Sequence, residues 1–151
     1  MSKEKYGLPG FLVGRCSTIV YKRWLHRNAM AHRKRDIKRG FPARTNGLYK
    51  EAIHRAILQS NGKDAYTGQD LEWERLGEWR NEESKDNGRT YKKSFGDLPS
   101  VDHVGDSADE LDFRICAWRT NDAKNDLTYE EFVDLCRSVV QFHQQKAGTQ
   151  T

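Results

Sequence analysis

The chain is poor in cysteine and proline, and it has no long apolar run. It holds three cysteines, Cys16, Cys116 and Cys136, without a C-x-x-C pair, and three prolines. The cysteines therefore support neither a disulfide framework nor a four-cysteine zinc site, and we expect them to be reduced packing residues. No apolar stretch approaches the roughly 20 residues of a membrane helix, and residues 1–6 lack the apolar stretch of a signal peptide. We therefore expect an intracellular, cytoplasmic protein without membrane contact.

What the chain does contain is enough for one folded domain. Its 151 residues are 36% hydrophobic and 32% charged, and they include four Trp, six Tyr and six Phe. A chain of this length can bury a core without covalent cross-links. No internal repeat or low-complexity tract suggests a linker, so we expect one compact domain overall.

The charges divide unevenly along the chain. Residues 1–64 hold 15 Lys and Arg against 4 Asp and Glu, whereas residues 65–151 hold 11 against 18. A dense basic cluster on one segment is typical of a surface that contacts the phosphates of a nucleic acid. Two solvated helix faces would give the same split. We interpret residues 1–64 as a basic helical region that contacts nucleic acid, and residues 65–151 as the region that holds metal or water.

Two helices are predicted in the basic region. Residues 19–38 combine a narrow apolar seam with many Lys and Arg, and they follow a hydroxyl side chain that can cap a helix. A glycine and a proline directly after them end the helix. In residues 45–60, apolar side chains recur at helical spacing, which predicts a second helix with a core-facing side. The stretch 73–79 is short and aromatic, and residues 80–93 are predicted to form a loop or a hairpin tip.

From residue 95 the pattern becomes strand, turn, strand, helix. Residues 98–104 are β-prone, residues 105–109 supply turn chemistry, and residues 112–118 alternate with the period of a pleated strand. A threonine then caps a helical turn at Asn121, and a capping box opens a further amphipathic helix from residue 128 that is expected to end before Gly148. The sequence therefore predicts an α+β fold with two antiparallel strands.

Three segments of this frame carry chemistry: Val-Asp-His-Val at 101–104, Asp-Phe-Arg-Ile-Cys at 112–116 and Asn-Asp-Ala-Lys-Asn-Asp-Leu at 121–127. A carboxylate and an amide oxygen can bind one hard divalent cation, with an imidazole beside it, as phosphodiester hydrolysis requires. In order and residue type the three segments resemble an HNH endonuclease, also called a ββα-metal or His-Me finger nuclease. The resemblance covers roughly residues 66–136. It implies a ββα-metal core with an N-terminal basic helical extension.

The resemblance assigns roles to three residues. His103 is similar to the general base of the family, Asp102 to a metal ligand, and Asn121 to a second ligand through its amide oxygen. The implied cofactor is Mg²⁺ or Mn²⁺, and one or two protein ligands suffice because Mg²⁺ keeps several waters. Without the resemblance, His103 would be interpreted as a packing histidine, Asp102 as a turn cap and Asn121 as a helix cap. Because neighbours in a regular strand point to opposite faces, Asp102 and His103 reach one site only if the strand breaks at His103.

Asp112 departs from the family pattern, which usually has asparagine there to orient the catalytic imidazole. A carboxylate can also accept from the imidazole of His103 and raise its basicity, so Asp112 is assigned a catalytic role. Alternatively, Asp112 caps the strand, and the orienting role is empty or falls to Asp109.

The zinc-binding C-x-x-C pair that many family members carry is also missing. In this chain, Tyr66-Thr67-Gly68 occupies the corresponding segment. No structural zinc is therefore expected, and the aromatic side chains of Tyr66, Trp73 and Trp79 are expected to pack in its place.

The expected partner is DNA, most simply a duplex. Lys124 lies three residues after Asn121, on the same helical face, where it can touch a phosphate. Basic residues of the first helix would contact the backbone without reading its sequence. The expected nucleic-acid contacts are Lys124, Arg114 and Arg119, together with Arg27, Arg33, Lys34, Arg35, Lys38 and Arg39.

The resemblance implies hydrolysis of DNA to 5′-phosphate and 3′-hydroxyl ends by a bacterial or phage-encoded enzyme. Two alternatives stay open. One is a non-catalytic nucleic-acid-binding protein with a degenerate HNH fold, and the other is a nonspecific nuclease toxin neutralised by an acidic partner. The residues do not indicate whether RNA is a substrate, which sequence is cut, or whether one strand or both are cleaved. They do not indicate the biological role either. The oligomeric state is open as well, with a homodimer as one alternative.

Overall fold

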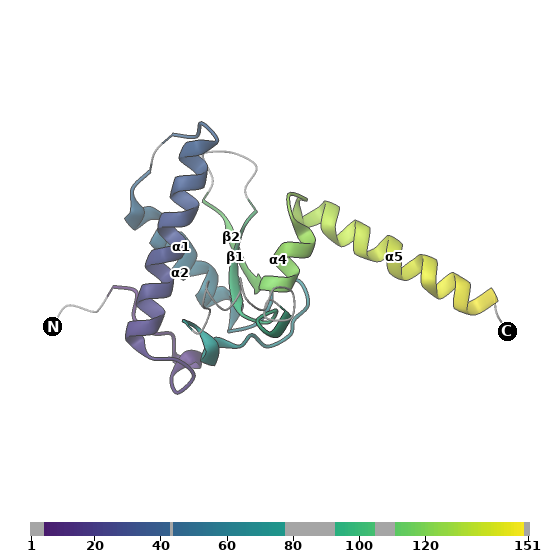
Figure 1. Ribbon diagram of the computed structural model, residues 1–151, viewed down its shortest axis with the longest axis horizontal. Coiled ribbons are helices and arrows are strands. Elements are labelled where there is room, and N and C mark those ends of the chain that lie inside the picture. The colour runs from purple at the N-terminus through teal and green to yellow at the C-terminus, as the bar shows by residue number, and fades with distance from the viewer. Residues whose placement is uncertain (1–4, 43, 78–92, 105–110, 150–151) are drawn as a thin grey trace. The chain divides into compact units, whose positions relative to one another are not determined.

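The computed structural model describes residues 5–42, 44–77, 93–104 and 111–149. These residues form a mixed α+β structure, as expected. Trp79, Asp109, the turn 105–109 and most of the loop 80–93 lie outside the described residues. No helix of the described part is long and apolar enough to cross a membrane. In chain order the elements are η1 (Gly10–Leu12), α1 (Thr18–Lys38), α2 (Asn46–Ser60), η2 (Trp73–Arg75), β1 (Pro99–His103), β2 (Phe113–Ala117), α4 (Trp118–Lys124) and α5 (Tyr129–Thr149) (Figure 1).

The first two helices begin at hydroxyl caps. The Ser17 side chain accepts a hydrogen bond from the Val20 amide at 3.1 Å, and the Thr45 side chain accepts one from the Leu48 amide at 3.2 Å. Each bond satisfies one of the backbone amides that a helix start leaves without a partner. Helix α2 ends at Asn61, whose φ of 52° is left-handed. Both predicted helices are confirmed, with bounds that differ from the prediction by one residue.

The core lies where α1 and α2 pack on each other and α2 packs on β2 (Figure 1). It joins the two segments on either side of residue 64. Trp73 is completely buried, meets Trp24 edge to face at a centroid distance of 5.5 Å, and donates from Nε1 to the Gly62 carbonyl at 3.0 Å. The larger buried apolar side chains include Tyr21, Leu25, Tyr49, Ile53, Ile57, Val101, Phe113 and Ile115.

Arg15 ties the segment before α1 to the loop that carries η2. Its Nη1 and Nη2 donate to the Asp70 carboxylate at 3.1 and 3.2 Å, its Nε to Glu74 at 2.5 Å, and Nη2 also to the Leu71 carbonyl at 2.7 Å. The hydrogen bond from Arg15 holds the pKa of Glu74 below its usual value. A planar guanidinium suits such a multiple contact because its donors are fixed in one fork.

The chain divides into two compact units, residues 1–121 and residues 122–151. The second unit contains α5, which runs through Gly148 and so exceeds its predicted end. Four of its apolar side chains are exposed within the described residues. Leu135, Val139, Val140 and Phe142 are each between 51% and 53% exposed.

Candidate functional site

The two strands form an antiparallel ribbon that leads directly into α4. Pro99 pairs with Ala117, Val101 with Ile115 and His103 with Phe113. The next residue, Trp118, begins α4, and its amide donates to the Leu98 carbonyl at 2.9 Å. The start of α4 is therefore fixed beside the start of β1, and the order strand, strand, helix agrees with the sequence prediction.

One face of β1 carries Ser100 and Asp102, since alternate residues of a strand share a face. Asn121 of α4 donates from Nδ2 to Ser100 Oγ at 2.9 Å. Asp102 is 6% exposed, and its Oδ2 accepts a hydrogen bond of 2.6 Å from the Tyr66 hydroxyl. Burial and then this bond raise the pKa of Tyr66, so the phenol stays a donor. The two expected metal ligands, Asp102 and Asn121, thus belong to the same side of the ribbon.

Asp64 fixes the loop that brings Tyr66 to this face. The carboxylate is 3% exposed, and its Oδ1 accepts from the amides of Tyr66 and Thr67 at 2.7 and 3.1 Å. Its Oδ2 accepts from the Ala117 amide at 2.9 Å and from Thr120 Oγ1 at 2.8 Å. The sequence analysis missed this residue. An Asp two residues before a turn amide is a recognisable Asx-turn signal, but its reach to β2 and α4 is tertiary.

His103 lies on the other face of the ribbon. Strand β1 continues through His103, and the following amide, of Val104, still pairs with the Asp112 carbonyl at 3.0 Å. The expected break of the strand at His103 is therefore wrong. Because the pleat is unbroken there, the His103 and Asp102 side chains point to opposite faces. The imidazole stacks on Phe113 with a centroid distance of 4.8 Å and an interplanar angle of 29°.

The carboxylate beside His103 comes from α1. Asp36 Oδ1 lies 3.5 Å from His103 Nδ1, and the two side chains are 5% and 9% exposed. Asp36 Oδ2 in turn accepts a 2.6 Å hydrogen bond from the Tyr49 hydroxyl of α2. Burial and then this bond raise the pKa of Tyr49 to about 12. Because a carboxylate only accepts, Asp36 favours the tautomer with the proton on Nδ1 of His103 and leaves Nε2 as the basic atom.

Asp36 is the second residue that the sequence analysis missed. It is the only acidic residue in the 21 residues of α1, and a lone carboxylate in a basic helix is a usable signal. His32 stands four residues earlier, on the same helical face.

His32 is a buried neighbour of this cluster. Its Nε2 lies 3.0 Å from the Val101 carbonyl, so this nitrogen carries the proton and donates. Its ring meets Phe113 and His103 edge to face, at centroid distances of 5.1 and 6.3 Å. Burial is the main reason why the pKa of His32 is lowered to about 4.

The other expected site residues have different neighbours. The Asp112 carboxylate pairs with Arg114 Nη1 at 2.9 Å, and Arg119 pairs with Asp97 at 3.0 Å. The carboxylate found beside the His103 imidazole is that of Asp36, so Asp36 is a candidate for the orienting role expected of Asp112. Lys124 is only 3% exposed, which disfavours the phosphate contact that was expected of it.

On α1, most of the expected DNA contacts are at the surface. Arg33 is the exception, because it is partly buried and its Nε donates to the Arg44 carbonyl at 2.5 Å. This bond holds the segment that follows the helix. The exposed basic residues of the expected set are Arg27, Lys34, Arg35, Lys38 and Arg39.

The side chains on the Asp102 face include a carboxylate and an amide, whose oxygens are of the type that binds a hard cation such as Mg²⁺. Within the described ranges, no three His, Cys, Asp or Glu side chains cluster as a metal site would need. Mg²⁺ does not need such a cluster, because one carboxylate and one amide oxygen are enough when waters and phosphate complete the shell. Asn121 uses its amide nitrogen on Ser100, and its oxygen is the atom suited to a cation. A carboxylate has about four acceptor sites, so the bond from Tyr66 does not exhaust Asp102.

Comparison with known proteins gives no further assignment. No family model, no curated protein and no solved structure matches the chain.

Proposed function

We propose that the chain is a metal-dependent HNH-type endonuclease that hydrolyses phosphodiester bonds of DNA. The observation that supports this most is the path of the chain from ribbon to helix, which brings Asn121 to the face of β1 that carries Asp102. Mg²⁺ or Mn²⁺ held by these two residues would supply Lewis-acid stabilisation of the phosphate and of the leaving oxygen.

His103 is the base in this proposal, and Asp36 is the residue that orients it. With the Nδ1 proton directed at Asp36, the Nε2 atom accepts the proton of the attacking water. Tyr49 holds Asp36 by its 2.6 Å hydrogen bond, so the imidazole is backed by two further side chains. Such backing groups fix the tautomer and the orientation of a functional histidine.

The proposal requires movement at the end of β1. His103 is the last residue of the strand and is on the face opposite Asp102. For both to act on one phosphate, the imidazole must come past the end of the strand. The last residue of β1 must therefore rearrange while Nδ1 of the imidazole stays within reach of Asp36.

The exposed basic residues of α1 would hold the DNA backbone. Arg27, Lys34, Arg35, Lys38 and Arg39 are the side chains available for such contacts. Contacts of this kind position a duplex without reading its sequence. Products would carry 5′-phosphate and 3′-hydroxyl ends.

Cleavage of supercoiled plasmid tests the proposal. The purified protein should nick or linearise it with Mg²⁺ or Mn²⁺ and should be inactive in EDTA. Asp102→Ala and Asn121→Ala should each lower the rate by about 100-fold or more. Asp122→Ala, an exposed neighbour on the same helix, should cleave at the parent rate. Undiminished cleavage by Asp102→Ala, or cleavage in EDTA, would remove the proposed metal site.

A second function has a specific observation in its favour. His103 is 9% exposed and faces away from Asp102, while Asp102 is hydrogen-bonded by Tyr66. This arrangement suits a non-catalytic DNA-binding protein in which the former site residues hold the fold together. Binding of DNA in EDTA, with no cleavage at any concentration of Mg²⁺ or Mn²⁺, would favour this function.

A further inference from the structure

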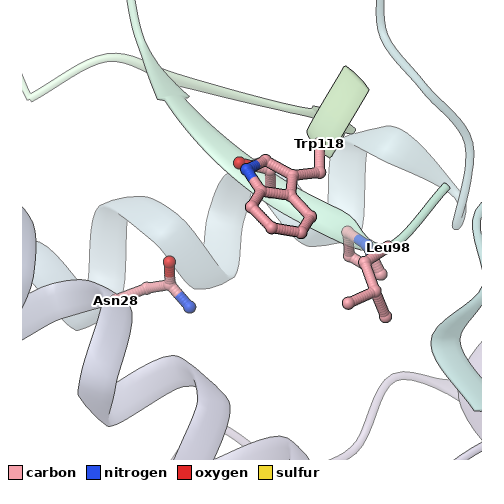
Figure 2. A pocket seen from close by; sticks show the side chains of 5 residues that line it. Asn28, Leu98 and Trp118 are labelled. Carbon is pink, nitrogen blue, oxygen red and sulfur yellow. The ribbon is translucent and has the colours of Figure 1, made fainter. Parts of the chain in front are cut away.

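A small open pocket lies between α1 and the start of β1, beside the Asp102 face. Its volume is about 220 Å³, and it is lined by Asn28, Leu98, Pro99, Ser100 and Trp118. Figure 2 shows the Asn28 amide and the Trp118 indole reaching into the same opening from α1 and from the first residue of α4, with Leu98 on the side away from Asn28.

We propose that this pocket binds one unstacked nucleobase of the nucleic-acid substrate. None of the five lining residues is charged, so the pocket suits a neutral planar ring better than a phosphate. Trp118 provides an aromatic face of the kind on which bases stack. Leu98 and Pro99 provide apolar contact, and the Ser100 hydroxyl can donate or accept.

Asn28 can read the edge of such a base. Its Nδ2 donates one hydrogen bond of 2.9 Å to the Trp24 carbonyl. An amide nitrogen carries two hydrogens, so one donor and the Oδ1 acceptor are left for a ligand. Asparagine makes this donor and acceptor pair with base edges. The bond to Trp24 also holds the amide at the pocket, which lowers the entropic cost of binding.

The position of the pocket fits a substrate that is also held at the candidate metal site. Ser100 lines the pocket, bonds Asn121 and is two residues from Asp102 on the same face. Two strand residues span roughly 7 Å, about two base steps of a strand at 3.4 Å each. The exposed Arg27 adjoins Asn28, and Arg35 lies two helical turns further along α1, where both can meet flanking phosphates. The link to cleavage rests on the proposed function, whereas binding of the base does not.

Binding measured in EDTA separates the two proposals, because no metal-dependent cleavage occurs. The probe is a fluorescein-labelled single-stranded DNA 12-mer of mixed sequence, followed by anisotropy over a range of NaCl concentrations. Trp118→Ala should weaken binding by about 5- to 100-fold, as expected when one base loses its stacking partner, and Trp118→Phe should keep most of the affinity. Asn28→Ala should weaken binding by a smaller factor.

Two comparisons make the result specific to a base. The slope of log affinity against log salt should be unchanged in Trp118→Ala, because the substitution removes no charge, while Arg35→Ala should flatten it. A 12-mer with abasic residues throughout should bind the parent and Trp118→Ala equally. The proposal is overturned if Trp118→Ala and Asn28→Ala bind the 12-mer as tightly as the parent, or if the abasic probe shows the same loss. Circular dichroism confirms that the variants are folded. If these binding results overturn the base pocket while the protein still cleaves plasmid with Mg²⁺, the nuclease proposal is unaffected.

Discussion

The two faces of β1 differ in what they contact. Val101 and His103 point toward α1 and α2, where His103 is stacked on Phe113 and paired with Asp36. Ser100 and Asp102 point toward Asn121 and Tyr66. The five residues of β1 thus carry an imidazole beside a carboxylate on one face, and hydroxyl, amide and carboxylate groups on the other. Adjacent positions such as Asp102 and His103 therefore contact different parts of the fold, because side chains alternate between the two faces of a pleated strand.

The largest expected effect comes from removing the carboxylate that holds the Asp102 face together. Asp64→Ala leaves the amides of Tyr66, Thr67 and Ala117 and the Thr120 hydroxyl without their acceptor. We expect a decrease of about 3–5 kcal/mol in the free energy of unfolding, measured by urea denaturation. Asp122→Ala removes an exposed carboxylate and should change stability by less than about 0.5 kcal/mol. Equal stability of the two variants would show that the four bonds to Asp64 contribute little.

The next effect concerns the His103 face and tests which carboxylate orients the imidazole. Asp36→Asn should lower kcat of plasmid cleavage by about 10- to 100-fold with little change in KM, because the substituted amide no longer favours one tautomer. Asp112→Asn should have a much smaller effect, since Asp112 pairs with Arg114. The opposite ranking would return the orienting role to Asp112.

The protonation of His32 gives the same face a dependence on pH. The pKa of His32 is lowered to about 4 in the folded chain, against about 6.5 in an unfolded one. The unfolded state therefore binds more protons between these values. The contribution of neutral His32 to the free energy of unfolding is fully present above about pH 6.5. It is lost as the pH falls toward 4, and the loss is about 3 kcal/mol at most. His32→Gln, which retains a donor for the Val101 carbonyl, should show a shallower decline between pH 6.5 and 4 in urea unfolding. An identical pH profile in this variant would assign the acid sensitivity to other groups.

The smallest effect is electrostatic and lies outside both faces. Neutralising Lys34 and Arg35 together should reduce the salt slope of DNA binding by about 0.9 for each duplex phosphate that these side chains no longer neutralise. Arg33→Ala should also lower stability, because Arg33 holds the Arg44 carbonyl. An unchanged slope in the double variant would move the DNA surface away from this end of α1.

Local signals in the sequence were sufficient for much of the fold. Hydroxyl caps and periodic apolar residues located α1 and α2, β-prone residues before turn chemistry located β1, and alternation located β2. The α+β class followed from their order. These features depend on neighbours within a few residues, which is why the sequence reveals them.

The contacts of the site were not predictable in the same way. Nothing near His103 in the sequence indicates that its carboxylate neighbour is Asp36, because this pair depends on how α1 crosses the ribbon. The bonds from Asp64 to Ala117 and Thr120 are equally distant in sequence. The expected break at His103 was wrong because the sequence pattern does not show that Val104 continues the ladder. Asp102 and Asn121 were grouped only through the resemblance to the HNH family, and the structure places Asn121 beside Ser100 on the same face of β1 as Asp102.

The contacts of Arg15 connect the segment before α1 to the loop that carries Tyr66 and η2. Arg15 forms ion pairs with Asp70 and Glu74. The loop that contains Asp70 also places the Tyr66 hydroxyl on Asp102. An Arg15→Ala variant would keep the Ser17 cap of α1, yet the loop that presents Tyr66 would lose its contacts with Arg15. A substitution before the first long helix would therefore loosen the position of the Tyr66 hydroxyl on Asp102, a residue 87 positions further along the chain.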